Sequence, residues 1–477
     1  MKNNRAFLNE IESRAKCNIC LDPNSVLFGS CDRSFWHYKI RDFSSIILQQ
    51  GAEIEFRRLQ KFDKKKAIIF AEGALKFWSD RALGWNAFEE YYPFEDGYPP
   101  LAFSTLSVIR LIALSNVEID RIPKLREALE KSANKLIKKS ETKALNQYSA
   151  GIAALAGLTK LNIAGTNKNN FRQKLDELLS YQTSEGWFPE YGSFDIGYLS
   201  VTLDCLWDIY DIFPSEELLN SIENASNFIG AILSIGRVSF GKFNSRNTDY
   251  VLPYGLIRTF CFNSNENLRL ALIEIRNQSA LYDSLDDRYL MHYIGISHIR
   301  AESYYVKNMS KFKISSEKEI FKKNDFELAG VCQVRFKGEI AWLNLRKGIV
   351  CSKNFSDWGI RLKIENNLYE SGVVPYSGDI CFEKKQFLVN ITKYNEFLPS
   401  FTKLSIIKIL AFFFGANLIG FLKKRAINRS DNKALMSYDE EQGINFISTD
   451  YKKSKDIFVF KSPPQSIRHV ASAEWNI

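Results

Sequence analysis

The spacing of apolar residues changes its period near residue 315 of this 477-residue chain. From about residue 40 up to that point, apolar side chains recur every three to four residues between short polar turns, which predicts α-helices. Beyond it, Val, Ile, Phe and Trp alternate with polar residues, which predicts β-strands. Helices first and strands afterwards predict an α+β protein with two segregated domains.

The first domain is expected to cover residues 1–308 and to be mostly helical. Its predicted helices cover 42–58, 63–79, 101–115, 122–139, 144–159, 169–182, 194–212, 216–234, 252–262, 266–280 and 286–306. Ser215 and Ser284 precede acidic residues and are predicted N-caps. So many helix pairs overfill a four-helix bundle and favour an (α/α) toroid or incomplete barrel, with a shallow solenoid as the alternative.

A polar, charged linker at 309–326 leads into the second domain, residues 327–477. Its alternating segments are VCQVRFKG, EIAWLNLRKG, DWGIRLKIE, DICFEKKQFLVNITKY and DIFVFKSPP. Turn-forming residues end each of these segments. This pattern predicts an antiparallel β-sandwich.

One segment of the second domain does not fit a strand. Leu404 to Leu422 is strongly apolar and is followed at once by three basic residues. Lys408 and Asn417 interrupt it, and strand-like sequence on both sides belongs to one sheet, so we expect a helical insertion at 404–425 that lies in a membrane interface. The expected membrane-contacting residues are Lys403, Lys408, Phe412, Phe413, Phe414, Lys423, Lys424 and Arg425. A helix buried between the domains and a true membrane span are the alternatives.

The charge distribution indicates the kind of partner. Sixty-four Lys and Arg against 55 Asp and Glu give a net charge of +9. Most of these charges are mixed, which argues against a nucleic-acid partner, but residues 403–429 contain no acid, which favours an anionic membrane surface. The amino terminus lacks an apolar h-region, so we expect a peripheral or monotopic protein on the cytoplasmic side of the inner membrane.

The common cofactor motifs are not found in the sequence. There is no P-loop, G-x-S-x-G elbow, H-E-x-x-H or dinucleotide fingerprint. Cys17, Cys20, Cys31 and His37 have a spacing that zinc could use, but the residues between them lack a zinc-finger hairpin pattern. We therefore expect no cofactor and mostly buried thiols.

Two segments in the first 105 residues combine aromatic rings with polar groups that could bind a sugar. They are residues 31–43 and the loop at 84–105. For the loop, buried packing is an equal alternative. The expected binding residues are Trp36, His37, Tyr38 and Asp42 in the first segment and Trp85 and Tyr98 in the second.

The most concentrated candidate site is SEGWFPEYGSFDIGY, residues 184–198. A Gly- and Pro-containing turn sets aromatic rings beside carboxylates, which can orient a sugar ring and shift a carboxyl pKa. Glu190 and Asp195 are candidate catalytic groups, and Trp187, Tyr191 and Tyr198 are candidate binding residues, with Asp195 and Tyr198 expected on one helix face.

A second candidate for catalysis is SLDDRYLMHY, residues 284–293. Arg288, Tyr289 and His292 are three or four residues apart and would meet on one side of a helix. His292 and His298 are six apart, too far around an undistorted helix to bind one metal. Asn146 and Tyr148, at the start of the predicted helix 144–159, could face the same cavity.

These segments together resemble the heparinase II/III-like proteins, especially members from bacterial surface-polysaccharide biosynthesis loci. The resemblance rests on DRSFWHYKIRDF (32–43), YPPLAFST (98–105), WFPEYGSFDIGYLS (187–200), DDRYLMHYI (286–294) and IRHVASAEW (467–475). It implies an α/α toroid followed by a β-sandwich. It also implies β-elimination on a uronic-acid polysaccharide, in which Tyr or His removes the C5 proton and Asn, His or Arg neutralises the sugar carboxylate.

Tyr289, His292, Arg288, Tyr148 and Asn146 supply the residue types that the resemblance implies. The apparent lack of a secretion signal and the apolar insertion favour a role at the cytoplasmic membrane face, on a lipid-linked or nascent glycan. Two alternatives remain: a glycoside hydrolase that uses Glu190 and Asp195, and a non-catalytic glycan- or polyprenyl-binding module of an assembly complex.

Overall fold

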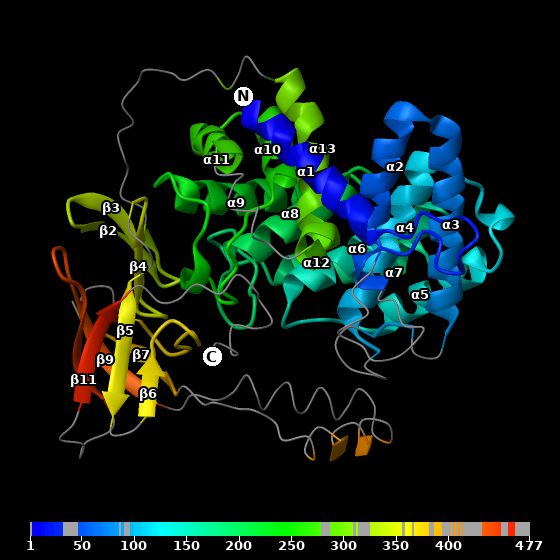
Figure 1. Ribbon diagram of the computed structural model, residues 1–477. Helices are drawn as coiled ribbons and strands as arrows, with labels where there is room; N and C mark the ends of the chain where they lie inside the picture. Colours follow the sequence, from blue (N-terminus) through cyan, green and yellow to red (C-terminus); the bar gives the residue numbers. More distant parts are fainter. Residues whose placement is uncertain are drawn as a thin grey trace.

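The computed structural model combines a helical region with antiparallel sheets (Figure 1). It describes residues 2–31, 46–84, 87–89, 96–277, 287–308, 312, 325–354, 358–364, 367–380, 386–393, 402, 405–406, 409–410, 413, 432–449 and 457–462. The helices occupy one side of the molecule and the strands the other, as the change of period in the sequence predicts.

The helical region contains most of the elements expected from the sequence. Its α-helices are α1 (Lys2–Asn18), α2 (Gln50–Phe62), α3 (Lys64–Leu83), α4 (Tyr98–Ser115), α5 (Leu125–Lys138), α6 (Leu145–Lys160), α7 (Lys168–Ser180), α8 (Ile196–Tyr210), α9 (Glu216–Leu233), α10 (Pro253–Phe262), α11 (Glu266–Asn277), α12 (Asp287–Tyr289) and α13 (Gly295–Lys307). Three short 3-10 helices, η1 (Ile46–Leu48), η2 (Ile119–Arg121) and η3 (Gly241–Phe243), lie between them. A π-helical turn, η5 (Leu290–Ile294), separates α12 from α13.

Alternate helices contact one another in a closed order. α2 contacts α4, α4 contacts α6, α6 contacts α8, α8 contacts α10, α10 contacts α13, and α13 contacts α2 again. The intervening helices α3, α5, α7, α9 and α11 contact members of this ring or each other. The ring therefore brings residues from positions 50 to 307 around one centre.

Helix α4 illustrates how the ring is packed. Among the described residues it is the one helix long and apolar enough to cross a membrane, but 78% of that window is buried inside the protein. Gly151 of α6 allows close approach, because a Cβ there would lie 2.1 Å from the Tyr98 hydroxyl oxygen of α4. The apolar character of α4 is thus accounted for by packing inside the ring.

The helix predictions differ from the structure in three places. Helix α1 was not expected, because its sequence is polar and its mean hydropathy is low; its Phe7, Ile11 and Ala15 are nevertheless buried. The helix predicted at 42–58 begins as α2 at Gln50. The helix predicted at 286–306 is broken by the π turn.

One predicted helix cap is present and one cannot be assessed. The Ser215 hydroxyl accepts a hydrogen bond of 3.2 Å from the backbone N of Leu218, as an N-cap should. Ser284 lies outside the described residues.

The strands form three antiparallel sheets. They are β1 (Asp325–Phe326), β2 (Val331–Phe336), β3 (Glu339–Asn344), β4 (Ile349–Ser352), β5 (Gly359–Ile364), β6 (Asn367–Glu370), β7 (Gln386–Asn390), β8 (Thr392–Lys393), β9 (Lys433–Asp439), β10 (Gly443–Thr449) and β11 (Ile457–Ser462). The strand orders are β1-β2-β3-β4, β10-β9-β7 and β11-β5-β6-β8. The hairpin β9–β10 was not expected from the sequence, although Gly443, which has a φ of 73°, sits at its turn.

Strand β3 links the helical core to the sheet core. Ala341 and Leu343 point to a core shared by all three sheets, whereas Trp342 packs with the helical core, as the two-residue period of a strand requires. The Trp342 indole donates a hydrogen bond of 2.9 Å to the carbonyl of Ile232. The Asn344 amide donates one of 2.8 Å to the carbonyl of Phe243. The first sheet is therefore joined to the helices by both apolar and polar contacts.

Candidate functional site

Three carboxylates satisfy the first backbone N–H groups of three neighbouring ring helices. Glu190 accepts from the backbone N of Asn146 in α6, at 2.6 Å. Asp195 accepts from the backbone N of Tyr198 in α8, at 3.1 Å. Asp204 accepts from the backbone N of Gly255 in α10, at 2.7 Å. Helix N-termini carry unpaired N–H donors and a partial positive charge, so these carboxylates stabilise that end of the ring.

The sequence predicted that Asp195 and Tyr198 lie on one face of a helix. Asp195 is instead the N-cap of α8. It is fully buried, and its other donors are the backbone N of Arg246, at 2.8 Å, and the Thr248 hydroxyl. Burial raises the pKa of Asp195, and these hydrogen bonds oppose that rise. Because both carboxylate oxygens accept hydrogen bonds, Asp195 has a structural role in fixing the loop that contains Arg246 and Thr248.

Glu190 has an environment unlike that of Asp195. It is buried, and its Oε2 atom and the Asn146 Nδ2 atom have no hydrogen-bond partner. Burial raises the pKa of Glu190 well above its ordinary value, against the hydrogen bond from Asn146. A buried carboxyl with one unsatisfied oxygen is most stable as the neutral acid, which can donate a proton. Glu190 and Asn146, predicted from separate segments, therefore meet.

Next to Asp195, aromatic hydroxyl groups from three segments form a cluster. The Tyr198 and Tyr250 ring centroids are 6.4 Å apart, and those of Tyr250 and Tyr293 are 5.6 Å apart. The Tyr250 and Tyr293 hydroxyl oxygens lie 2.6 Å from each other. Tyr198 is partly exposed, whereas Tyr250 and Tyr293 are buried. The two segments that the sequence singled out, 184–198 and 284–293, thus converge.

The pKa of Tyr198 has a cation among its causes, unlike that of its neighbour Tyr250. Burial raises its pKa, the nearby phenols of Tyr293 and Tyr289 raise it further, and the Arg246 cation lowers it. The pKa of Tyr250 is raised by burial and by Tyr293, with no cation among its causes. The pKa values of both phenols therefore lie well above the ordinary value, and only for Tyr198 does a nearby cation oppose the rise.

The π turn places His292 at the edge of this cluster. The His292 ring centroid is 4.4 Å from that of Phe103 and 4.5 Å from that of Tyr293. His292 and Tyr289 are both partly exposed. Single π turns inside α-helices occur frequently at functional sites. His298 is instead buried edge-on against Phe7 of α1, at 5.1 Å, and burial lowers its pKa to about 3.

Helix α1 fixes the start of the same segment. Asp287 accepts a hydrogen bond of 2.6 Å from Arg14 Nε and one of 2.8 Å from Asn18 Nδ2. Asp287 therefore anchors the turn that carries Tyr289 and His292. The side chain of Arg288 lies outside the part of the chain that the structure describes.

Tyr191 and Arg246 form a cation–π pair beside the cluster. The Arg246 guanidinium lies 4.4 Å from the Tyr191 ring centroid, and both side chains are partly exposed. Tyr191 has a φ of 53°, in the left-handed region that a bulky residue rarely adopts. Such strain is concentrated at binding and active sites. Arg246 was not predicted from the sequence.

Trp187 lies in the core and contributes to the junction with the sheets. It is buried, and its indole donates a hydrogen bond of 2.9 Å to Glu185. Glu185 also accepts from the backbone N of Leu328, at 2.7 Å, and of Ala329, at 3.0 Å. The structure therefore gives Trp187 a packing role rather than an exposed stacking surface.

Tyr148 and Tyr98 form a separate pair. Both are buried, with ring centroids 6.3 Å apart. The Tyr148 hydroxyl donates to Glu177, and burial followed by this hydrogen bond raises the pKa of Tyr148. We expected Tyr148 and Asn146 to face the same cavity, but the Tyr148 hydroxyl points to Glu177 of α7.

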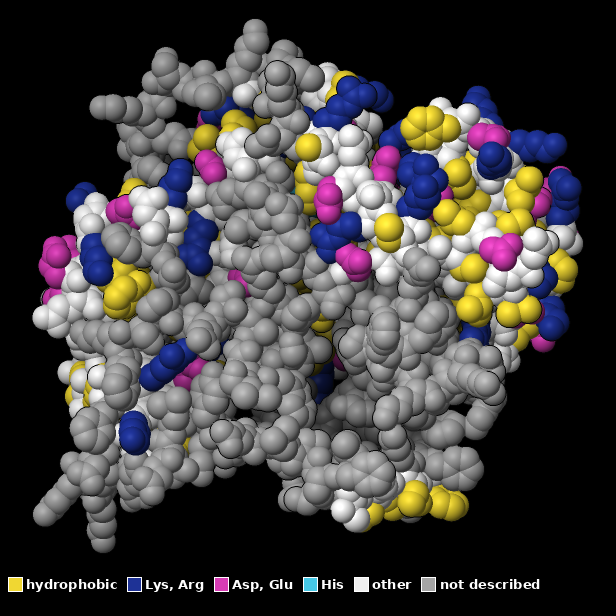
Figure 2. All heavy atoms as spheres, viewed as in Figure 1, with side chains coloured by type: hydrophobic (Ala, Val, Ile, Leu, Met, Phe, Trp, Pro, Cys, Tyr) yellow, Lys and Arg dark blue, Asp and Glu magenta, His cyan; other side chains and the backbone are white. Residues whose placement is uncertain are grey.

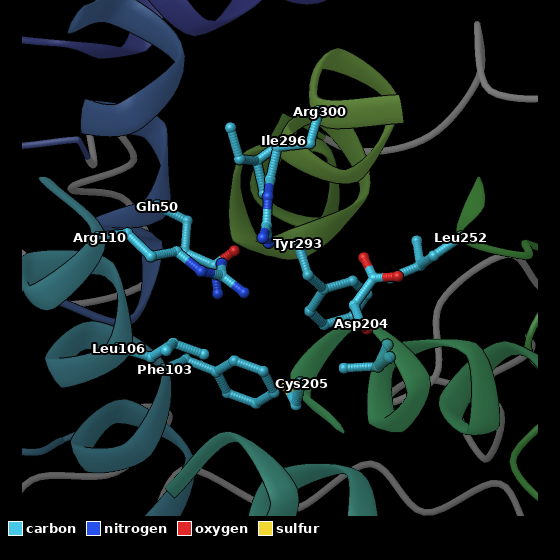
Figure 3. A pocket seen from close by; sticks show the side chains of 11 residues that line it. Gln50, Phe103, Leu106, Arg110, Asp204, Cys205, Leu252, Tyr293, Ile296 and Arg300 are labelled. Carbon is cyan, nitrogen blue, oxygen red and sulfur yellow. The ribbon is translucent and has the colours of Figure 1, made fainter. Parts of the chain in front are cut away.

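A small cavity with a mostly apolar wall and a few charged and polar groups lies between the helices of the ring (Figure 3). Its volume is about 10 Å³, which accommodates one water molecule. Gln50 of α2, Arg110 of α4, Asp204 of α8 and Arg300 of α13 contribute its polar lining, together with Tyr293. Gln50 is buried and its Oε1 has no hydrogen-bond partner. The cavity adjoins the phenol cluster through Tyr293.

Asp208 of α8 joins two arginines from the helices on either side of α2. It accepts hydrogen bonds from Arg110 of α4 and Arg300 of α13. Burial would raise the pKa of Asp208, but the two cations outweigh burial and lower it. Neighbouring Asp204 is less compensated, and burial raises its pKa to about 6. This network was not predicted, because its members are far apart in the sequence.

Several predicted residues lie outside the described part of the chain. They are Trp36, His37, Tyr38, Asp42, Trp85, Lys403, Lys408, Phe412, Phe414, Lys423, Lys424 and Arg425. Phe413 is described and is exposed. Within the described residues, no group of three or more His, Cys, Asp and Glu side chains could hold a metal ion, and His37 was not part of that search.

Comparison of the chain with protein-family models, with curated proteins and with solved structures finds no match.

Proposed function

We propose that this protein binds an acidic sugar polymer at the phenol cluster and cleaves it by β-elimination. The observation that carries the proposal is the convergence of the Tyr198, Tyr250 and Tyr293 rings, with His292 packed on Tyr293 and the Arg246 cation acting on Tyr198. Burial keeps the pKa of Tyr198 well above its ordinary value, so Tyr198 acts as the base only once it is ionised, a form that the Arg246 cation favours. A cation also stabilises the enolate-like charge that develops on the sugar carboxylate.

The proposed reaction uses Tyr198, Arg246 and His292. The Tyr198 phenolate takes the proton from C5 of a uronic acid unit, and Arg246 faces the carboxylate attached to that carbon. The C5 electron pair forms a C4–C5 double bond while the C4–O bond breaks. The departing oxygen receives a proton from His292 or Tyr289. The products are a shortened chain and an unsaturated sugar, so atoms and charges balance.

The resemblance to heparinase II/III-like proteins supports the same reaction class. In this proposal the closed ring of helices is the α/α toroid and the three sheets form the β-sandwich that the resemblance implies. The substrate is a bacterial surface polysaccharide or its lipid-linked precursor. Tyr191, stacked on Arg246, would contact a neighbouring sugar ring.

Hydrolysis is the weaker alternative, although one observation favours part of it. Burial raises the pKa of Glu190 well above its ordinary value, which favours the protonated form that a glycosidase acid needs. Its intended partner Asp195 already accepts hydrogen bonds from Tyr198, Arg246 and Thr248. A carboxylate occupied in this way is poorly placed to activate water.

The test is incubation of the full-length protein with uronic-acid polysaccharides and with neutral dextran as the control polymer. Elimination produces ultraviolet absorbance from the new double bond, together with reducing ends. Hydrolysis produces reducing ends without that absorbance, and a binding module produces neither while isothermal titration still detects the polymer. Either of the last two results would overturn the proposed elimination.

Two variants assign the chemistry to the cluster. Tyr198→Phe removes the base but preserves the ring, so it should lower kcat by at least about 100-fold with little change in binding. Tyr210→Phe is the matched control, because Tyr210 is also a partly exposed tyrosine of α8 but lies at the other end of that helix. Equal activity of the two variants would remove Tyr198 from the mechanism.

A further inference from the structure

Four apolar side chains of the insertion are exposed to solvent. Residues 402, 405, 406, 409, 410 and 413 have helical backbone. The exposed fractions are 52% for Ile406, 59% for Ile409, 37% for Leu410 and 72% for Phe413. Figure 2 shows this group as a hydrophobic projection at the lower edge of the molecule, where Figure 1 draws the short orange helical pieces. We refer to these four residues as the apolar stripe.

The spacing of the apolar stripe makes it one face of a helix. Positions i, i+3, i+4 and i+7 lie on the same side of an α-helix, and the four residues follow that pattern from Ile406 to Phe413. Their exposure argues against the alternative of a helix buried between the domains. Other large exposed apolar side chains, such as Val26 and Phe62, are not part of a four-residue helical stripe. A contiguous apolar face of this kind marks an interaction surface.

The charge of the sequence that contains the apolar stripe identifies the partner. Residues 403–429 contain six Lys and Arg and no Asp or Glu. Basic residues beside an apolar helical face are typical of helices that lie in the interface of an anionic bilayer. We propose that the apolar stripe inserts into the acyl boundary of an anionic membrane while the neighbouring basic residues contact its headgroups.

A second copy of the chain is a less suitable occupant. A symmetric dimer places the same patch of both subunits together. Two basic segments without any acid would then face each other, and like charges in an interface are unfavourable. Anionic lipid headgroups neutralise the same charges. The membrane proposal is independent of the proposed sugar chemistry, since it uses none of the residues of the phenol cluster.

The experiment is flotation of the full-length protein with vesicles of phosphatidylcholine alone and with vesicles containing about one third phosphatidylglycerol. We expect binding to the anionic vesicles and at least tenfold weaker binding to the neutral ones. Binding should weaken at high salt, because the headgroup contribution is screened. Equal binding to both vesicle types, or to neither, would overturn the proposal.

Matched variants test the two parts of the surface. Ile409→Glu/Phe413→Glu should lower the vesicle partition coefficient at least tenfold, because charged groups enter the acyl boundary unfavourably. Phe62→Glu is the control, since Phe62 is 78% exposed but lies on α2 outside the apolar stripe. Lys423→Gln/Lys424→Gln/Arg425→Gln should weaken only the binding to anionic vesicles.

Two outcomes distinguish the competing occupants, and a third measurement is a control. If the Glu variants change the oligomeric state in light scattering but not flotation, the stripe binds a second copy and the proposal fails. If wild-type protein resists extraction from cell membranes by alkaline carbonate, it spans the bilayer and does not lie in the interface. Thermal unfolding of each variant excludes a folding defect as the cause of lost binding.

Discussion

The hydroxyl oxygens of Tyr250 and Tyr293 lie 2.6 Å apart, and this hydrogen bond joins the loop before α10 to the π turn. Both side chains are buried, so each hydroxyl depends on the other for part of its hydrogen bonding. The contact holds together two segments of the proposed site that are 43 residues apart in the sequence.

Removing the hydroxyl group of one tyrosine of this pair should lower the free energy of unfolding more than removing both hydroxyl groups does. Tyr293→Phe leaves the buried Tyr250 hydroxyl without this partner and should lower the free energy of unfolding by about 1–3 kcal/mol. The double variant Tyr250→Phe/Tyr293→Phe removes both polar groups and should be closer to wild type. A double-mutant cycle from urea denaturation measures the coupling, and simple additivity of the two single variants would contradict the prediction.

Asp208→Asn should destabilise the protein strongly. The variant leaves Arg110 and Arg300 close together without the carboxylate between them, which should cost about 3–5 kcal/mol. Asp211→Asn is the control, because its carboxylate is about half exposed and its pair with Arg258 should contribute no more than about 1 kcal/mol. Calorimetry of both variants provides the comparison. Similar losses of stability would contradict the prediction that the buried Asp208 pairs contribute more than the exposed Asp211 pair.

Asp204 should make stability depend on pH. Its pKa is raised to about 6 in the folded protein from 3.8, so the folded state binds the proton more tightly than the unfolded chain. Stability attributable to Asp204 therefore falls as the pH rises from about 4 to about 6, by up to about 3 kcal/mol. The difference in unfolding free energy between wild type and Asp204→Asn should change by that amount across this range. A difference that does not change with pH would contradict the prediction.

Gly151→Ala should be destabilising mainly because of Tyr98. The added Cβ would lie 2.1 Å from the Tyr98 hydroxyl oxygen, and relieving that overlap should cost about 1–3 kcal/mol. Tyr98→Phe removes the closest atom but leaves the ring Cζ 2.9 Å from the added Cβ, so the double variant should regain part of the lost stability. Thermal unfolding of the single and double variants tests this, and a double variant no more stable than Gly151→Ala would locate the strain elsewhere.

Glu190 variants separate the helix cap from the acid. Glu190→Gln can still accept from the backbone N of Asn146, so stability should change little. Glu190→Ala loses the cap and should cost about 0.5–2 kcal/mol. Loss of turnover in the Gln variant would assign catalysis to the Glu190 proton, whereas retained turnover is expected if Tyr198 is the base.

The sequence predicted two segments that the structure brings together, but it did not predict the residues that organise them. The segments 184–198 and 284–293 were identified from aromatic rings and charged groups that are close together in the chain, and Tyr198, Tyr293 and His292 do meet. Arg246 was missed because it lies in a loop with no distinguishing local pattern. Its position follows from the hydrogen bond between its backbone and Asp195, 51 residues away.

The features that the sequence predicts are local. The helix and strand periods, the Ser215 cap and the alternation that turns Trp342 away from Leu343 depend on residues within one or two turns of each other. The tertiary structure alone decided which carboxylate caps which helix, that α13 returns to α2, and that Asp208 lies between arginines 98 and 92 residues away. Such pairings depend on how whole helices pack, and helix packing is set by many side-chain contacts at once, which no short stretch of sequence encodes.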